Sequence, residues 1–131
     1  MKNVLIDTSA LIAVIANEPE KGKLVALVDG CSLIAPKSVY WEIGNAFSAM
    51  LKRGRVTIAQ VECALGVFNE IPVRYLDVDL HESLVVASQR GIYAYDAYLL
   101  ASAMRHKVPL LTLDQQMARM AKDMCIDVLE V

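Results

Sequence analysis

Four acidic residues stand where a carboxylate could do chemistry. Asp7 ends the apolar run "VLID", and Asp114 ends the run "LLTLD". Glu42 and Asp96 lie among apolar residues at helical spacing. Carboxylate oxygens are the ligands that Mg²⁺ and Mn²⁺ prefer. If the four carboxylates converge, they could hold one or two divalent ions, activate water and stabilise an in-line displacement at phosphorus.

Asp7 and Asp114 also have a purely structural explanation. Both stand at expected strand-to-helix junctions, and aspartate is a good N-cap. In the segment "DTSALIA", Thr8 or Ser9 could cap the helix instead. We therefore expect Asp7 to face a ligand site, with one of the two hydroxyls as the cap.

Glu42 and Asp96 are harder to explain as structural residues. Glu42 borders the apolar stripe of its expected helix, and Asp96 precedes two leucines at helical spacing. An ionised carboxylate in such a place is costly unless it is paired or bound to a metal. A buried cation or a backbone amide could pair with each carboxylate. The cations nearest to Asp96 in the sequence are Arg90 and Arg105.

The elements that must position these acids alternate along the chain. Apolar runs predict strands over residues 3–6, 32–35, 73–76, 110–112 and 127–129. Helical periodicity predicts helices over residues 38–52, 57–70, 79–90, 94–106 and 114–122, with Thr57 as an N-cap and Gly91 as a stop. This order favours a three-layer α/β/α sandwich with a five-stranded, mainly parallel sheet. Ligands of such sheets bind at the carboxyl ends of the strands, where Asp7 and Asp114 stand.

Composition narrows the class of protein. The 131 residues fit a single domain over residues 1–131, and a hydrophobic content of 56% excludes disorder. No apolar run reaches the roughly 20 residues that cross a bilayer, and no secretory signal is present, so we expect a cytoplasmic protein. The net charge of −2 requires any nucleic-acid contact to be local. Two histidines argue against a histidine-rich metal site, and Cys31, Cys63 and Cys125 fit small core residues rather than a disulfide framework.

Motifs along almost the whole chain resemble the PIN-domain family, specifically the VapC-type toxin ribonucleases of type II toxin–antitoxin pairs. They are "LIDTSALIA", "VYWEIGNAF", "YAYDAYLLASA" and "PLLTLD". The resemblance implies strand order 3-2-1-4-5 and a Mg²⁺ or Mn²⁺ site formed by Asp7, Glu42, Asp96 and Asp114, at which an RNA phosphodiester is hydrolysed.

The resemblance also implies supporting roles for four polar residues: Thr8, Ser9, Asn45 and Thr112. Helix capping, strand structure or helix-surface polarity could explain the same residues. The implied partners are the RNA substrate, a second copy of the chain in a homodimer, and a cognate antitoxin whose C-terminal segment covers the active site.

Two groups of residues could contact a substrate. The basic residues Lys52, Arg53 and Arg55 could grip phosphates, although cations are also favourable at a helix C-terminus. Aromatic residues flank the acids and could stack on bases or pack in a core or interface; they are Tyr40, Trp41, Tyr93, Tyr95 and Tyr98.

Two other functions fit the same acids. One is a metal-dependent phosphatase or DNA nuclease. The start "LIDTSA" is similar to that of aspartyl-phosphate phosphatases, but those carry a second aspartate two residues after the nucleophile, where this chain has Ser9. The other is a binding module in which the acids are structural.

Overall fold

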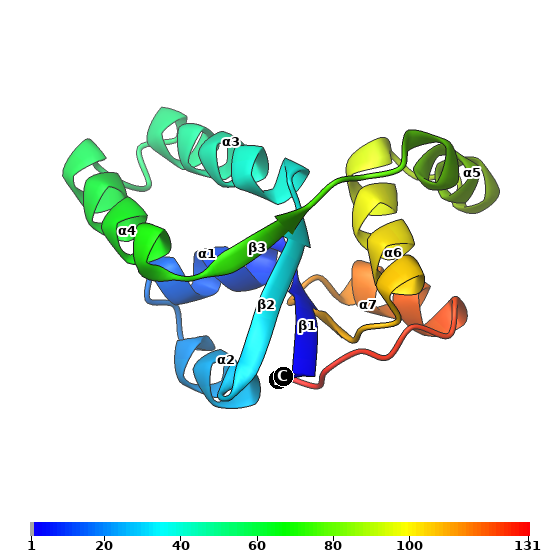
Figure 1. Ribbon diagram of the computed structural model, residues 1–131. Coiled ribbons are helices and arrows are strands. Elements are labelled where there is room, and N and C mark those ends of the chain that lie inside the picture. The colour runs from blue at the N-terminus through cyan, green and yellow to red at the C-terminus, as the bar shows by residue number, and fades with distance from the viewer. Residues whose placement is uncertain (1) are drawn as a thin grey trace.

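A parallel sheet of four strands lies at the centre of the structure, a computed structural model that describes residues 2–131 (Figure 1). The strands are β1 (Lys2–Ile6), β2 (Cys31–Pro36), β3 (Val73–Leu76) and β4 (Leu110–Leu111). Their order is β3-β2-β1-β4, and every pairing is parallel. The parallel sheet and the first four positions of the predicted order are therefore confirmed.

The prediction of a fifth strand over residues 127–129 is wrong. Within residues 2–131 this segment makes a single parallel bridge, between Leu110 and Val128. The Leu110 N–H donates to the Asp127 carbonyl at 2.8 Å, and the Leu129 N–H donates to the Leu110 carbonyl at 3.0 Å. Because β4 has only two residues, it offers too short an edge for a further strand. The segment lies where a fifth strand would pair, without forming one.

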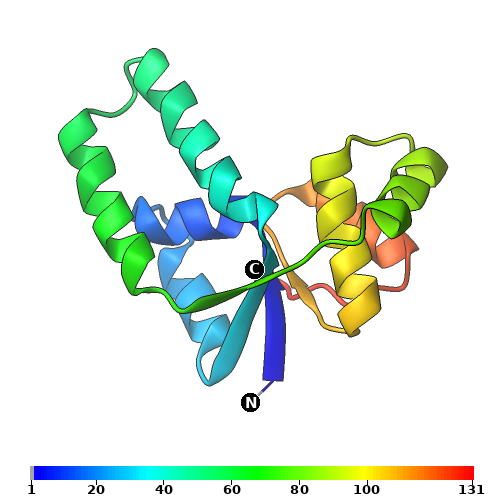
Figure 2. The same cartoon turned by 45° about the horizontal axis from the view of Figure 1, so that its top comes forward.

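Helices cover both faces of the sheet (Figures 1 and 2). One group consists of α1 (Thr8–Ile15), α2 (Lys21–Val28), α3 (Ser38–Lys52) and α4 (Ile58–Glu70). The other consists of α5 (Leu80–Arg90), α6 (Ala94–His106) and α7 (Gln115–Asp123). Helix α6 packs on β2 from one side, and α2 and α3 contact the same strand. The three-layer arrangement is as predicted, although no helix was predicted for the residues of α2.

Local signals place several helix ends. Thr57 caps α4 through a reciprocal pair of hydrogen bonds: the Gln60 N–H donates to Thr57 Oγ1 at 3.2 Å, and the Thr57 N–H donates to Gln60 Oε1 at 2.9 Å. Gly91 ends α5 in the left-handed conformation, with φ +64°. Both predictions are confirmed.

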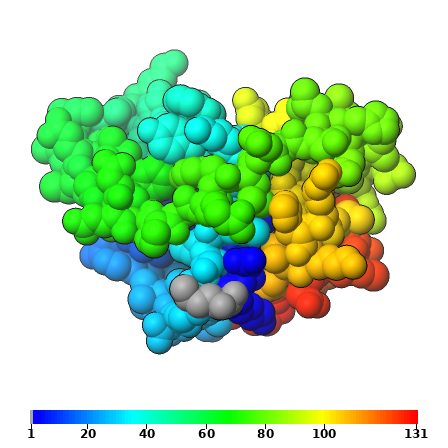
Figure 3. Space-filling view, viewed as in Figure 1, coloured from blue at the N-terminus to red at the C-terminus, as the bar shows by residue number. Residues whose placement is uncertain are grey.

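The core lies between the sheet and the two helical groups. β1 contributes Val4, Leu5 and Ile6, and the buried face of α6 contributes Leu99 and Leu100. β3 forms an edge of the sheet, and it and its flanking segments cross the front of the molecule as green atoms in Figure 3. Among residues 2–131, every helix is too short or too polar to traverse a membrane.

Candidate active site

The four predicted acids line one cavity of about 540 Å³. Asp7 follows the carboxyl end of β1, and Asp114 follows β4 after a short turn. Glu42 lies near the start of α3, and Asp96 lies in the first turn of α6. Four segments that are far apart in the sequence therefore meet at the carboxyl edge of the sheet, where parallel α/β folds bind ligands.

Asp7 is held by hydrogen bonds on both carboxylate oxygens. It is 3% exposed, and its Oδ1 accepts from the Ser9 hydroxyl at 2.7 Å and from the Ala10 N–H at 3.0 Å. Its Oδ2 accepts from the Thr112 hydroxyl. Asp7 is therefore the N-cap of α1, and the prediction that Thr8 or Ser9 caps this helix is wrong. The backbone at Asp7 is extended, with φ −94° and ψ 174°, and this places the Asp7 carboxylate over the free N–H groups of the first turn of α1.

Thr112 and Ser9 connect the two strand-end acids. Thr112 is buried; its hydroxyl donates to Asp7 and accepts from the Asp114 N–H at 3.0 Å. The Ser9 hydroxyl accepts from the Leu113 N–H at 2.9 Å. Asp114 in turn caps α7 through Oδ1. Capping and cavity lining are thus compatible for both aspartates.

Glu42 and Asp96 have no compensating cation in the part of the chain that the structure describes. Within residues 2–131, no ion pair includes either of them, and Arg105 pairs with Glu82 at 3.0 Å instead. The Oε1 atom of Glu42 is buried and has no hydrogen-bond partner among these residues. A buried carboxylate oxygen without a partner is costly unless the group is protonated or bound to a cation, so this atom is a candidate cation ligand.

Burial and mutual repulsion favour the protonated forms of these acids. Burial raises the pKa of Asp7, and Asp114 adds repulsion. Burial, followed by repulsion from Asp96 and Asp7, raises the pKa of Glu42 to about 7. Burial and then repulsion from Asp114 raise the pKa of Asp96. The repulsions connect all four acids in a closed ring, which a bound cation would relieve.

The donor set suits a hard divalent cation, because it consists of oxygens and includes Glu42 Oε1, which has no hydrogen-bond partner among residues 2–131. No three acidic, histidine or cysteine side chains among residues 2–131 are grouped as a ready-formed metal site. An ion entering the cavity therefore has to draw the carboxylates closer together.

The other predicted site residues fall into two groups. Thr8 and Ser9 line the cavity with the acids, and Thr112 lies behind Asp7. Asn45 is exposed on α3 and does not line this cavity, so its supporting role stays a prediction.

The basic cluster Lys52, Arg53 and Arg55 is exposed at the C-terminal end of α3. At about 1.5 Å per residue, it lies roughly 15 Å from Glu42 along the helix. Phosphate binding by this cluster also stays a prediction.

Two cavity-lining acids were missed by the sequence analysis. Glu18 and Glu20 line the cavity from the connection between α1 and α2. The only signal was the tetrapeptide "NEPE", which looks like an ordinary polar turn.

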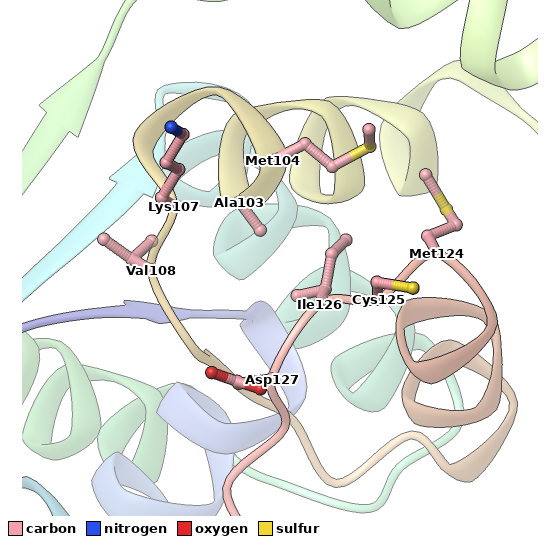
Figure 4. Close-up of a pocket in the computed structure, with 8 residues that line it drawn as sticks. All are labelled: Ala103, Met104, Lys107, Val108, Met124, Cys125, Ile126 and Asp127. Carbon is pink, nitrogen blue, oxygen red and sulfur yellow. The ribbon is translucent and has the colours of Figure 1, made fainter.

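A second cavity, of about 300 Å³, lies near the start of β4 (Figure 4). Its charged side chains are Lys107 and Asp127, and the rest of its lining is apolar or sulfur-containing. It contains none of the predicted site residues. The cavity at the carboxyl edge is therefore the candidate active site.

A parallel sheet with an acidic cavity at its carboxyl edge defines the class of protein: a three-layer α/β domain whose site consists of carboxylates. Within that class, the PIN domain family model matches residues 4–123. The chain therefore belongs to the PIN-domain family, a family of nucleases.

Solved structures share this fold. PAE2754 from Pyrobaculum aerophilum is 28% identical with a TM-score of 0.72, and the match covers 92% of this chain and 87% of that one. VapBC2 from Rickettsia felis, bound to a DNA fragment from its promoter, is 15% identical with a TM-score of 0.68, covering 97% of each chain. VapC20 from Mycobacterium tuberculosis, a toxin that cleaves the sarcin-ricin loop, is 18% identical with a TM-score of 0.60, covering 89% of this chain and 94% of that one. No curated protein sequence matches the chain.

Proposed function

We propose that the chain is a divalent-metal-dependent endoribonuclease, a single nuclease domain over residues 1–131, and the toxin of a toxin–antitoxin pair. One observation carries the proposal: Asp7, Glu42, Asp96 and Asp114 line one cavity, repel one another and have no cation among residues 2–131. Structural carboxylates are normally paired, whereas a catalytic metal site collects them unpaired.

The four acids would hold Mg²⁺ or Mn²⁺, with Asp7 as the most firmly oriented ligand. When bound, the ion supplies the positive charge that activates water and stabilises the charge developing on the phosphate. The hydrogen bonds from Thr112 and Ser9 fix the Asp7 carboxylate before the ion arrives. Such outer partners keep ligands oriented and are a large part of a working metal site.

Glu42 can exchange a proton near neutral pH. Burial and the neighbouring acids raise the pKa of Glu42 to about 7, so its carboxyl group takes up a proton near neutral pH when no cation is bound. A bound cation would favour the ionised form of Glu42, so metal affinity should increase with pH. The basic cluster of Lys52, Arg53 and Arg55 would grip backbone phosphates upstream or downstream of the cleaved bond.

The toxin assignment draws on the structural neighbours. VapBC2 is a toxin–antitoxin complex, and VapC20 is a toxin that cleaves the sarcin-ricin loop. By analogy, we propose a cytoplasmic homodimer inhibited by a cognate antitoxin. The exposed apolar side chains of α5, such as Leu80 and Leu84, are available for such contacts.

A cleavage assay tests the catalytic proposal. Purified protein freed of any antitoxin is incubated with structured RNA, single-stranded DNA and a phosphate monoester, each with Mg²⁺ or EDTA. We expect RNA cleavage that requires the metal and is lost in Asp7→Asn and Asp96→Asn. Asp123→Asn, on the exposed end of α7, is the matched control and should cleave normally.

Other outcomes identify other functions. Full cleavage by the Asp96→Asn protein contradicts the four-acid site. Cleavage confined to DNA or the monoester indicates a DNA nuclease or phosphatase that uses the same acids. Inactivity on all three substrates, with correct folding and bound Mn²⁺, favours a binding module.

A further inference from the structure

Three sulfur-bearing side chains line the cavity near the start of β4. Met104 belongs to α6, and Met124 and Cys125 follow one another directly after α7. Figure 4 shows their sulfur atoms on one side of the cavity, where α7 ends. Met104 is 48% exposed and Cys125 is exposed, so a solute can reach the sulfurs from the solvent. The volume of about 300 Å³ is at the lower limit for an organic ligand and leaves ample room for an ion.

Sulfur donors of this kind select a soft metal ion. Thiolate and thioether sulfurs bind Cu(I), whereas carboxylate and carbonyl oxygens suit Mg²⁺ and Mn²⁺. Zn²⁺ takes thiolate, imidazole and carboxylate ligands, and of these the lining within residues 2–131 offers only Cys125 and Asp127. Once the Cys125 thiol has lost its proton, Cu(I) and three sulfur ligands carry no net charge. A neutral complex fits a lining that also includes Val108 and Ile126, because burial of a net charge is costly.

The backbone holds Cys125 in an unusual conformation beside the cavity. Its φ is +60°, in the left-handed region that residues other than glycine seldom adopt. The Cys125 N–H donates to the Lys122 carbonyl at 3.0 Å, and the Ile126 N–H donates to the Ala121 carbonyl at 2.9 Å. These two bonds form a Schellman motif, in which glycine is the usual left-handed residue. A cysteine at this position costs stability, which favours a function for its side chain.

The charges around the cavity also permit a cation. Helices α6 and α7 both end beside it, and the C-terminal end of a helix carries partial negative charge. Lys107 brings a competing positive charge and Asp127 a negative one, so the two formal charges of the lining cancel. In Figure 4 the Lys107 Nζ atom lies across the cavity from the sulfurs. The sulfur side therefore faces the end of α7 without an ammonium group next to it.

We propose that Met104, Met124 and Cys125 form a Cu(I) site in this cavity, with two thioethers and one thiolate as ligands. Binding breaks the Sγ–H bond of Cys125 and forms an Sγ–Cu bond. The proton passes to water and copper stays in the Cu(I) state, so no oxidant or reductant is required. The site does not depend on the proposed nuclease, because it lies near the start of β4, whereas the acids line the cavity at the carboxyl edge of the sheet.

A competition titration tests the site. Copper-free protein is titrated anaerobically with Cu(I), in ascorbate and with a coloured Cu(I) chelator whose absorbance reports the copper that the protein removes. We expect the protein to take up one equivalent of Cu(I) that Zn²⁺ does not displace. X-ray absorption at the copper edge should show only sulfur neighbours. The bound ion should also raise the melting temperature, since it binds the folded state.

Substitutions identify the ligands. Met104→Leu and Met124→Leu keep the volume of the side chain and should bind Cu(I) at least about 10-fold more weakly, since the loss of even an outer partner of a metal ligand costs that much. Cys125→Gly should bind no Cu(I) at this site. Because glycine adopts φ +60° without strain, the copper-free Cys125→Gly protein should melt no lower than the wild type. Cys63→Ala, an exposed cysteine on α4, is the matched control and should bind as the wild type does.

Several results would overturn the proposal. Unchanged Cu(I) affinity in both leucine variants reduces the site to a single reactive thiol. Displacement of the copper by Zn²⁺, or nitrogen and oxygen neighbours at the copper edge, contradicts the sulfur ligands. Equal loss of binding in Cys63→Ala assigns the copper to scattered surface thiols. A copper-dependent dimer in size-exclusion chromatography that Cys125→Gly abolishes shows an ion bridging two copies of the chain, which contradicts a site within one chain.

Discussion

Replacement of Glu42 by glutamine should stabilise the metal-free protein at neutral pH. Glutamine keeps the shape of the side chain but removes a charge that burial and the neighbouring acids oppose. The pKa of Glu42 rises from 4.5 to about 7 on folding, so the folded protein binds a proton that the unfolded chain has released. This proton stabilises the folded state fully below pH 4.5, and its contribution is lost as the pH increases toward 7.

The size of the effect follows from the same shift. One pKa unit corresponds to about 1.4 kcal/mol, and water screens part of the repulsion because Glu42 is only half-buried. After that discount, Glu42→Gln should gain about 1–2 kcal/mol at pH 8, or roughly 3–6 °C in melting temperature. The gain should disappear near pH 4, where wild-type Glu42 is protonated in both states.

The assay is thermal unfolding followed by circular dichroism, from pH 4 to pH 8 in EDTA. Glu62→Gln, on the exposed surface of α4, is the matched control and should show no pH-dependent difference. Added Mg²⁺ should reverse the order, because it stabilises the wild type more than the variant. A variant that melts below the wild type at pH 8 in EDTA, or a difference independent of pH, would refute the account of the acidic cavity.

Three further changes test the surrounding structure. Thr112→Val removes the hydroxyl that donates to Asp7; we expect a loss of about 1–3 kcal/mol in urea unfolding and weaker Mn²⁺ binding by calorimetry, and unchanged stability would contradict this hydrogen bond. Leu100→Ala should cost about 2–5 kcal/mol in the same unfolding assay, because Leu100 is fully buried under the sheet, and a cost below about 1 kcal/mol would contradict that packing. Gly91→Ala should destabilise the protein by about 1–2 kcal/mol, because φ is +64° there. Gly66→Ala, in the middle of α4, should stabilise it by up to about 1 kcal/mol. Changes of the same sign in the free energy of unfolding would contradict the assigned backbone conformations.

The layers of the fold could be predicted from the sequence because its periodicities are clear. Short β-branched runs alternate with helical stripes. Thr57 begins α4 and Gly91 ends α5, as these residues predict. Local periodicity could not show whether residues 127–129 form a fifth strand. Its apolar residues fit a strand, but its partner β4 is only two residues long, and a partner's length is a property of the fold rather than of the segment.

In the site, too, some residues could be predicted from local sequence and others depend on the fold. Glu42 and Asp96 stood out because an acid on an apolar face violates a local rule, and such violations are typical of functional sites. Glu18 and Glu20 violate no rule, since acids in a polar turn are ordinary, and only the path of the chain brings them to the cavity. Local sequence can indicate a residue that is out of place, but not one that the fold carries to the site.

Asp7 shows why a structural role and a catalytic role should not be treated as alternatives. The backbone N–H that it caps and the hydroxyls of Ser9 and Thr112 all approach its carboxylate, and together they fix the direction in which the remaining lone pairs point. A metal ligand needs such fixing, because each degree of freedom lost on binding weakens the ion's affinity. The first turn of α1 therefore orients the group that we propose as the principal metal ligand. The same reasoning extends to Asp114, whose Oδ1 caps α7 and whose second oxygen makes no hydrogen bond within residues 2–131. In both cases the helix cap fixes the carboxylate that we propose as a metal ligand.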